Sequence, residues 1–332
     1  MITIRERVEH YLAQRQALGT GLSISTTRIL RTFATFVEDQ GAQHITVDLF
    51  LLWQKQDGSA SQVTWSKRYS HVRVFTRWLH ALDPNCEVLP EGLITAVKSR
   101  PKPYIYADQE ITNIIDAALQ LRSPSGSGLR GPTHATLYGL IAVTGLRISE
   151  AVNLVDDDVD IEKGTLRIRH AKHHIRRIIP ITPCTANKLA SYRELRDRSL
   201  ARKAPAFFLS ENGYMVTSPT ARRSFAQSCA SIGLRNQQEG PNFGKGPRIH
   251  DLRHSFAVRT LIDWHRQGLD VDRELYKLSN WLGHHSPKET YWYLEAVPEL
   301  LQITLEKVEQ AYRQGQWHSV YLSDEGKIFF EL

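Results

Sequence analysis

A short segment with two prolines, SRPKPY at residues 99–104, divides the chain into two parts with different sequence patterns. Each proline fixes its own φ and disfavours helix at the residue before it, so we expect an extended connector here. With 332 residues, the chain is long enough for two compact domains that each have a core. The sequence therefore predicts a first domain at 1–98, a linker at 99–106, a second domain at 107–310 and a tail at 311–332.

The spacing of apolar residues predicts a mainly helical protein. In the first part they recur at helical intervals from Val8 to Phe36 and again in later segments, with polar or Gly- and Pro-bearing turns between them. In the second part, helices are expected near 108–119 and before Gly145. Two β-branched runs, 166–169 and 175–181, predict a β-hairpin. The expected fold is mainly α with a small β-hairpin or sheet, in two domains.

The net charge of +7 indicates a polyanionic partner, and nucleic acid is the usual one, because lysine and arginine release counterions from phosphates. The three cysteines are few and widely spaced, which argues against a disulfide framework or a Cys-rich zinc site and is typical of a reducing cytoplasm. No apolar stretch is long enough to cross a bilayer, and the first residues do not resemble a signal peptide. We therefore expect a cytoplasmic protein without a membrane partner.

Two segments of the second part present basic side chains on turns. In TGLRISE (144–150), Arg147 follows the predicted helix end at Gly145, where a guanidinium can be held rigidly and can bind a phosphate through two parallel hydrogen bonds. In HAKHH (170–174), Lys172 lies at the predicted hairpin tip and could reach a nucleic-acid groove. Taken alone, each segment is also consistent with a solvated surface side chain.

Two later segments add titratable groups. In HDLRHSF (250–256), His250 and Arg253 are three positions apart and share a helix face, a suitable pair for binding and protonating a phosphate oxygen. In LGHHSPKETYWY (282–293), Gly283 ends one helix and the Ser286–Glu289 capping box begins another. Tyr291 and Tyr293 on that new helix point in nearly opposite directions, so one can face a site while the other packs.

Taken together, these segments resemble the signature boxes of the tyrosine recombinases, also called the phage integrase family. The resemblance covers the second domain closely; the first resembles the family's core-binding domain only in length and helical character. The usual glycines around the hairpin lysine are replaced here by Ala171 and His173. The family's nucleophile lies nine residues after the histidine of LGH, which selects Tyr293 over Tyr291. The resemblance implies these catalytic residues, in chain order: Arg147, Lys172, His250, Arg253, His284 and Tyr293, with Glu150 in support.

The resemblance also implies a mechanism that needs no cofactor, metal or ATP. Tyr293 would attack the scissile phosphate to form a 3′-phosphotyrosyl link and release a 5′-hydroxyl. Arg147 and Arg253, assisted by His284, would stabilise the pentavalent transition state, and Lys172 would protonate the departing 5′-oxygen. His250 would assist proton transfer from the tyrosine or support the phosphate.

The expected partner is double-stranded DNA bound by a homo-tetramer on paired sites, with a partner recombinase or accessory protein left open. The expected reaction is site-specific recombination, without a choice between integration, excision, resolution and transposition. The C-terminal segment is expected to dock on a neighbouring protomer or to pack on its own domain.

Three alternatives are a type IB topoisomerase, a non-catalytic DNA-binding relative and a metal-dependent transposase. The acidic run at 156–160 could suggest the last of these. We interpret it as a solvated turn before the hairpin.

Overall fold

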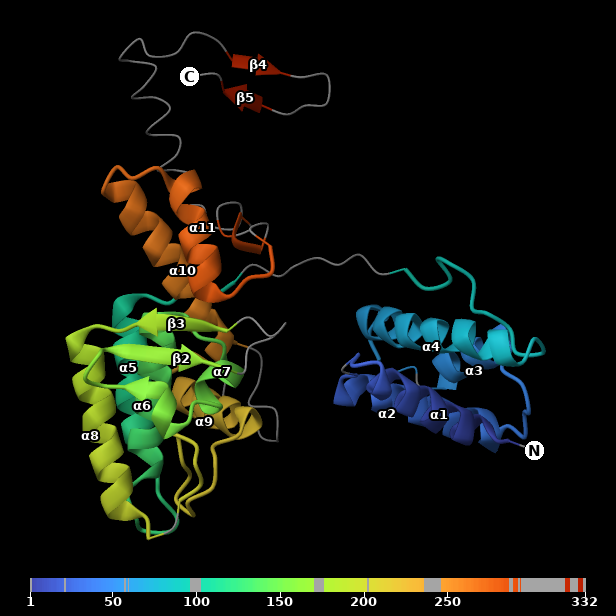
Figure 1. Ribbon diagram of the computed structural model, residues 1–332, viewed down its shortest axis with the longest axis horizontal. Coiled ribbons are helices and arrows are strands. Elements are labelled where there is room, and N and C mark those ends of the chain that lie inside the picture. Colours follow the sequence, from blue (N-terminus) through green and yellow to red (C-terminus); the bar gives the residue numbers. More distant parts are fainter. Residues whose placement is uncertain are drawn as a thin grey trace. The chain divides into compact units, whose positions relative to one another are not determined.

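The computed structural model describes residues 2–20, 22–56, 58, 60–95, 103–169, 176–201, 203–235, 246–286, 289–291, 293, 320–322 and 328–330. The chain divides into two compact units, Met1–Pro101 and Lys102–Leu332 (Figure 1). The described elements are mostly helices with a small antiparallel sheet, which confirms the predicted fold class.

The first unit contains four helices, α1 (Ile4–Ala17), α2 (Ile24–Asp39), α3 (Val47–Gln56) and α4 (Gln62–Leu82). Hydroxyl side chains cap three of them, because Thr3, Ser23 and Ser61 each accept a hydrogen bond from an N–H in the first turn. The helices enclose an apolar core rich in aromatic rings, in which Phe50 packs edge-on against Phe33 and Trp65.

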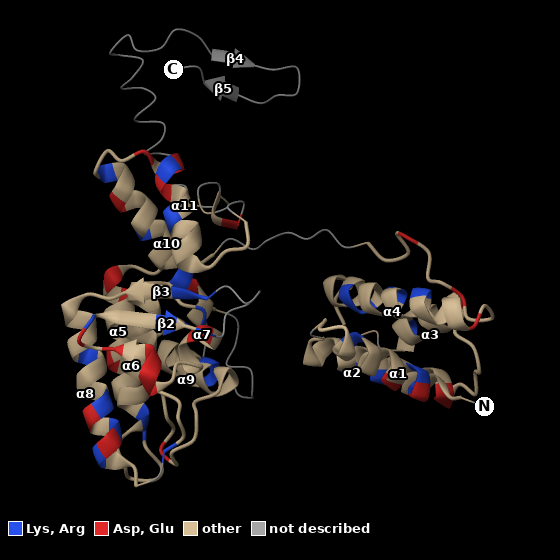
Figure 2. Ribbon diagram, in the orientation of Figure 1, with Lys and Arg blue, Asp and Glu red and all other residues tan. Residues whose placement is uncertain are grey.

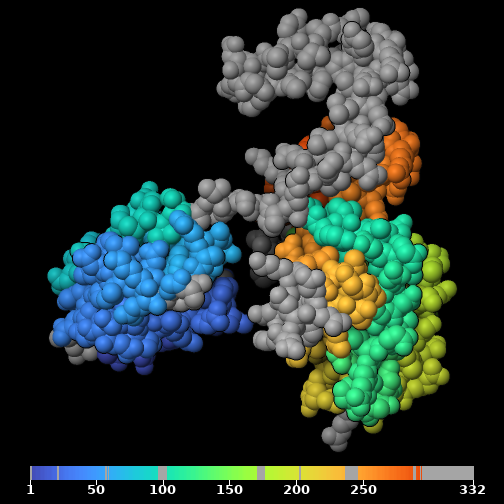
Figure 3. Space-filling model, turned by 180° about the vertical axis from the view of Figure 1, so that it is seen from behind, coloured from blue at the N-terminus to red at the C-terminus, as the bar shows by residue number. Residues whose placement is uncertain are grey.

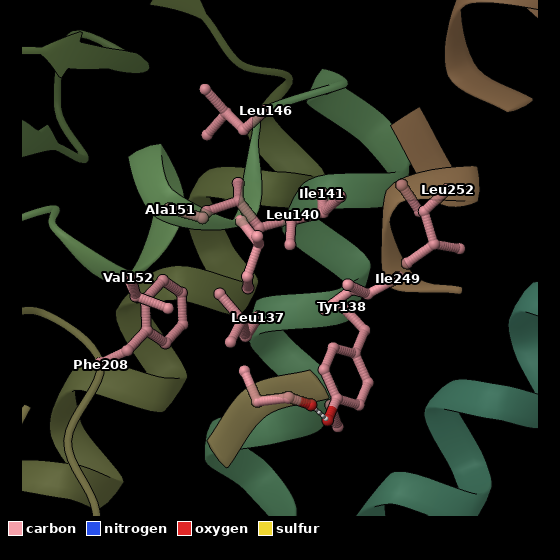
Figure 4. Packing of buried hydrophobic residues seen from close by; sticks show 14 of the residues in the cluster. Leu137, Tyr138, Leu140, Ile141, Leu146, Ala151, Val152, Phe208, Ile249 and Leu252 are labelled. Atoms are coloured by element: carbon pink, nitrogen blue, oxygen red, sulfur yellow. Dashed lines mark hydrogen bonds between the residues drawn. The ribbon is translucent and has the colours of Figure 1, made fainter. Parts of the chain in front are cut away.

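The second unit is built mainly from seven described α-helices, which are α5 (Asp108–Leu119), α6 (Arg130–Thr144), α7 (Ile148–Val152), α8 (Pro183–Ser199), α9 (Ser218–Ser231), α10 (Ile249–Arg266) and α11 (Val271–Leu282). Helix α6 packs against α5, α8, α9 and α10. Its apolar side chains, among them Leu137, Leu140 and Ile141, are buried (Figure 4). The hydroxyl of Tyr138 donates to the carbonyl of Ala221, which satisfies the one polar atom of that buried side chain. When the unit is viewed from behind, α5 lies beside α9 (Figure 3).

The sheet contains three short antiparallel strands, β1 (Val159–Asp160), β2 (Thr165–Ile168) and β3 (Arg177–Pro180). Leu166 pairs with Val159 on one side and with Ile179 on the other. The predicted hairpin is therefore β2–β3. Residues 170–175, which include its tip, lie outside the described residues. Two further strands, β4 (Val320–Leu322) and β5 (Ile328–Phe330), pair antiparallel with each other.

The acidic run at 156–160 is a turn before the hairpin, as predicted, but it is only partly solvated: Asp157 is exposed and Asp158 is buried. It forms a 3₁₀ turn, η1 (Asp156–Asp158), that leads into β1. Asp158 is buried and pairs with Arg169 at 2.5 Å, and Asp156 pairs with the fully buried Arg196 at 3.0 Å. The carboxylates therefore hold the start of the sheet to its neighbours through ion pairs.

The predicted linker, 99–106, extends into the second unit. Tyr106 is only 1 % exposed, its N–H donates to Ser255 Oγ, and its hydroxyl donates to the carbonyl of Arg248.

Basic and acidic residues both occur along α1 and α8 (Figure 2). In the part of the chain that the structure describes, no helix combines the length and apolar character that a membrane span requires.

Candidate active site

A tight turn after α6 leads directly to Arg147. The helix ends at Gly145, which has a left-handed φ of +65°. A Cβ at this position would lie 2.5 Å from Cδ1 of Phe256 and 2.9 Å from Cδ2 of Leu282. Only glycine accommodates both the φ and the close packing. Arg147 follows two residues later as the N-cap of α7, so its backbone position is fixed by the turn.

The guanidinium of Arg147 is held on two sides. Nη1 donates to Glu150 Oε1 at 3.0 Å, and both Nη1 and Nη2 donate to the carbonyl of Gly283 at 3.0 Å. The backbone N–H of Arg147 also donates to Glu150 Oε2 at 3.0 Å. One carboxylate therefore fixes the main chain and the side chain of the same arginine.

Glu150 is buried and binds a second arginine, Arg177 at the start of β3. Arg177 donates through Nη1 and Nη2 to the two carboxylate oxygens, at 3.2 and 2.8 Å, and through Nε to the carbonyl of Trp281 at 2.7 Å. Burial opposes ionisation of Glu150, but the hydrogen bonds and charge of Arg177 outweigh it, so the pKa of Glu150 lies below its usual value. Arg177 was not among the predicted site residues.

Arg253 on α10 is almost fully buried, at 1 % exposure. Its Nη1 donates to the carbonyl of Gly145 at 2.7 Å and its Nη2 to the carbonyl of Leu282 at 2.8 Å. Burial, followed by the like charge of Arg147, lowers the pKa of Arg253 to about 10, so the side chain is still a cation at neutral pH.

The C-terminal end of α11 connects all three arginines. The carbonyls of Trp281, Leu282 and Gly283 accept from Arg177, Arg253 and Arg147 respectively. These groups lie at the negative end of the helix dipole, which favours cations. Gly283 has a φ of +62°, and a Cβ there would lie 2.6 Å from Nη1 of Arg177, so glycine is required where the helix meets the arginines.

His250 and His254 lie one turn apart on α10, with ring centroids separated by 4.6 Å. Loss of hydration around the His250 ring, followed by the positive charge of Arg253, lowers the pKa of His250 to about 4. His250 is therefore neutral at pH 7, although the residue keeps contact with solvent.

The two candidate tyrosines lie in different environments. Tyr293 is 2 % exposed and Tyr291 is 39 % exposed. The hydroxyl of Tyr293 lies 2.9 Å from Nδ1 of His254. Its ring is nearly parallel to that of His284, at 16° and a centroid distance of 6.4 Å, and Nδ1 of His284 lies 2.7 Å from Oγ1 of Thr290.

The structure thus brings together six of the seven residues selected from the sequence. These are Arg147, Glu150, His250, Arg253, His284 and Tyr293, and they come from the α6–α7 turn, α7, α10 and the segment after α11. Lys172 lies outside the described residues, so its position in the site stays a prediction. The described part of the site offers fixed cations for a phosphate and a phenol in contact with an imidazole.

A metal ion has few candidate ligands in the described residues. His44, Asp83 and Cys86 of the first unit place one ligand atom each within 4.8 Å of one another. Nη1 of Arg7, however, lies 2.9 Å from the carboxylate of Asp83, so a cation already pairs with the central ligand. The arrangement around Arg147 and Arg253 is suited to an anion.

Replacing Arg177 with methionine is expected to destabilise the second unit by about 3–5 kcal/mol, because Glu150 would remain buried with one of its two cationic partners gone. Arg176→Met is the matched control, since Arg176 is the adjacent, exposed arginine. Urea unfolding of the full chain measures both variants. Equal stabilities of the two would contradict this account of Glu150.

Stability should also depend on the ionisation of Glu150. Its pKa is lower in the folded protein than the unfolded value of 4.5, so its stabilisation is complete above pH 4.5 and is lost as pH falls through the lowered folded value. The difference in unfolding free energy between wild type and Glu150→Gln should therefore shrink as pH falls below about 4.5. Urea titrations at pH 7.0, 4.5 and 3.5 test this. A difference that stays constant with pH would contradict it.

Comparison with known proteins identifies the family of the chain. The family model described as "Phage integrase family" matches residues 108–299, more than half of the chain. A putative integrase/recombinase, y4rB, from Sinorhizobium fredii (strain NBRC 101917 / NGR234) is 36% identical over 315 residues, which cover 94% of this chain and 99% of the relative. Tyrosine recombinase XerD from Lacticaseibacillus casei is 27% identical over 297 residues, which cover 86% of this chain and 90% of that one.

Solved structures share the fold at low sequence identity. The XerH site-specific recombinase bound to palindromic difH substrate has a TM-score of 0.61 at 18% identity, covering 89% of this chain and 82% of that one. A lambda integrase (75–356) dimer bound to a COC' core site has a TM-score of 0.59 at 17% identity, covering 86% and 96%. The family match and the similarity to y4rB together establish that this chain belongs to the phage integrase family, the tyrosine recombinases.

Proposed function

We propose that the protein recombines double-stranded DNA at specific sites, cutting and rejoining it through a 3′-phosphotyrosyl link at Tyr293. The observation that carries the proposal is the position of Tyr293, buried beside the arginines of the site. Its hydroxyl lies 2.9 Å from Nδ1 of His254, the residue that follows Arg253 on α10. This position supports the assignment of Tyr293 as a nucleophile that attacks a phosphate held by the arginines.

Arg147 and Arg253 would stabilise the extra negative charge on the non-bridging oxygens of the pentavalent transition state. Both are fixed before DNA binds, because main-chain carbonyls and Glu150 hold their guanidinium groups. Such groups stabilise a transition state without first having to reorganise. Glu150 acts through the arginines it binds and touches no reacting atom.

The remaining roles concern protons and the phosphate. Lys172 would protonate the departing 5′-oxygen, and His284 would assist the arginines at the phosphate. His250, which is neutral at pH 7, would support the phosphate or assist proton transfer. The transesterification preserves the phosphodiester energy in the covalent link, so we propose that it uses neither metal nor ATP.

We assign DNA binding to both units, with residues 1–98 as the core-binding domain, 99–106 as the linker, 107–310 as the catalytic domain and 311–332 as a tail. The net charge of +7 supports a DNA partner. The proposed place of action is the cytoplasm, where bacterial DNA lies, since the curated relatives named above are bacterial proteins. A partner recombinase or accessory protein is compatible with this function.

The identity of the nucleophile can be tested with a DNA substrate nicked near candidate sites from the flanks of the protein's own gene. Wild type and Tyr291→Phe are expected to form a covalent protein–DNA adduct on a denaturing gel, and Tyr293→Phe is expected to form none, because phenylalanine lacks the attacking oxygen. An adduct lost only in Tyr291→Phe would assign the nucleophile to Tyr291. Tight DNA binding without any adduct would favour a non-catalytic relative.

The oligomeric state distinguishes this function from that of a type IB topoisomerase, which acts as a monomer. We propose a homo-tetramer in which the C-terminal segment docks on a neighbouring protomer. A chain truncated after residue 297 should still bind one DNA site but should lose complexes that hold two sites, as measured by native gel shift with two DNAs of different length. Pairing of two sites by the truncated chain would contradict this docking.

A further inference from the structure

Helix α10 places a second histidine, His254, in direct contact with the hydroxyl of Tyr293. Nδ1 of His254 lies 2.9 Å from the hydroxyl of Tyr293, which is within the reach expected of a general base. The ring centroids of His254 and Tyr293 are 5.4 Å apart at an angle of 59°, so the contact is edge-directed and not a stack.

The other histidines of the site are placed differently. The ring of His254 contacts both the ring of His250 and that of Tyr293. His284 lies nearly parallel to the phenol ring, and the lone pair of an imidazole nitrogen lies in the ring plane and not above its face. Nδ1 of His284 is engaged with Thr290. Of these histidines, His254 is the one whose ring nitrogen lies at hydrogen-bond distance from the reacting oxygen in the contacts described above.

We propose that His254 accepts the proton of Tyr293 during DNA cleavage and returns it during rejoining. This inference deepens the proposed function and rests on it. The phenol oxygen forms the new bond to phosphorus, and its proton passes to Nδ1, which produces an imidazolium. The bond from phosphorus to the 5′-oxygen breaks, and that oxygen takes its proton from a separate donor, for which we have proposed Lys172. Rejoining reverses each transfer, so no other reactant is consumed.

The charges around His254 are compatible with this cycle when DNA is bound. His254 contacts the titratable rings of His250 and Tyr293. Arg253 precedes it on α10, and Arg147, Glu150 and Arg177 are charged groups that act on Arg253. The ring of His284 lies against the ring of Tyr293. A bound phosphate adds negative charge at the arginines and so favours proton transfer to His254 when the nucleophile attacks.

The test uses asparagine at position 254, because its side-chain oxygen can occupy the place of Nδ1 and accept the tyrosine hydrogen bond without becoming a base. His254→Asn should lower the single-turnover cleavage rate about 10²–10⁴-fold, the range for general acid–base groups. His265→Asn, near the far end of the same helix, should cleave like wild type. In wild type, the cleavage rate should rise with pH through the titration of the imidazole, and this rise should be missing in His254→Asn.

A substrate with sulfur in place of the bridging 5′-oxygen shows whether a residue acts on the nucleophile or on the leaving group. A thiolate leaves without protonation, so this substrate no longer needs a proton donor for the leaving group. This substrate should restore the rate of Lys172→Ala and should not restore that of His254→Asn. Restoration of His254→Asn would move the residue to the leaving-group side and overturn the inference. A wild-type cleavage rate for His254→Asn with ordinary DNA would mean that the contact between His254 and Tyr293 has no role in proton transfer, and this result would also overturn the inference.

The two proposals can fail separately. If wild type forms the Tyr293 adduct and His254→Asn forms it equally fast, only the role of His254 is lost. If wild type forms no adduct, the proposed function fails and the role of His254 fails with it. A measurement without DNA checks the contact itself: the imidazole of His254, followed by NMR, should titrate at a different pH in Tyr293→Phe. An unchanged titration would contradict the contact.

Discussion

Three arginine side chains donate hydrogen bonds to the last carbonyl groups of one helix, and the rest of the site depends on these hydrogen bonds. Arg177, Arg253 and Arg147 donate to the carbonyls of residues 281, 282 and 283, where α11 ends. Bringing three cations together in a buried place is unfavourable, because burial and then the like charge of a neighbouring arginine destabilise each cation; both effects lower the pKa of Arg253. The helix dipole and the buried carboxylate of Glu150 offset this repulsion.

The same contacts connect the site to the core of the second unit. The turn at Gly145 is covered by Phe256 and Leu282, which belong to the two helices that carry Arg253 and the accepting carbonyls. Tyr293 lies in the apolar cluster formed by α10 and α11. A change that loosens the packing of these helices would therefore move the arginines, the nucleophile and His254 together. An anion that binds between Arg147 and Arg253 finds its partners already in place, which reduces the cost of ordering them.

Much of this arrangement could be predicted from short patterns. The TGLR, HxLR and LGH segments identify residues whose local geometry follows from a glycine stop or from a shared helix face, and the structure brings the described ones together. Arg177 could not be identified in this way, because it lies beside an exposed arginine, and no local pattern says which of the two meets Glu150. His254 is part of the HDLRHSF segment, but no local pattern favours it over His250 as the partner of the tyrosine. The ion pairs of the acidic run could not be predicted because its partners, Arg169 and Arg196, follow the run by about ten and forty residues.

The sequence by itself determined the family, the helical fold class, the positions of the turns and the residue types available for chemistry, since each depends on local spacing or on glycine and proline. Only the tertiary structure decided which charges pair, which tyrosine is buried and which histidine reaches its hydroxyl. The physical reason is that burial and hydrogen bonding depend on groups that packing brings together from positions far apart in the chain. Arg147 and Gly283, for example, are 136 residues apart and share a hydrogen bond.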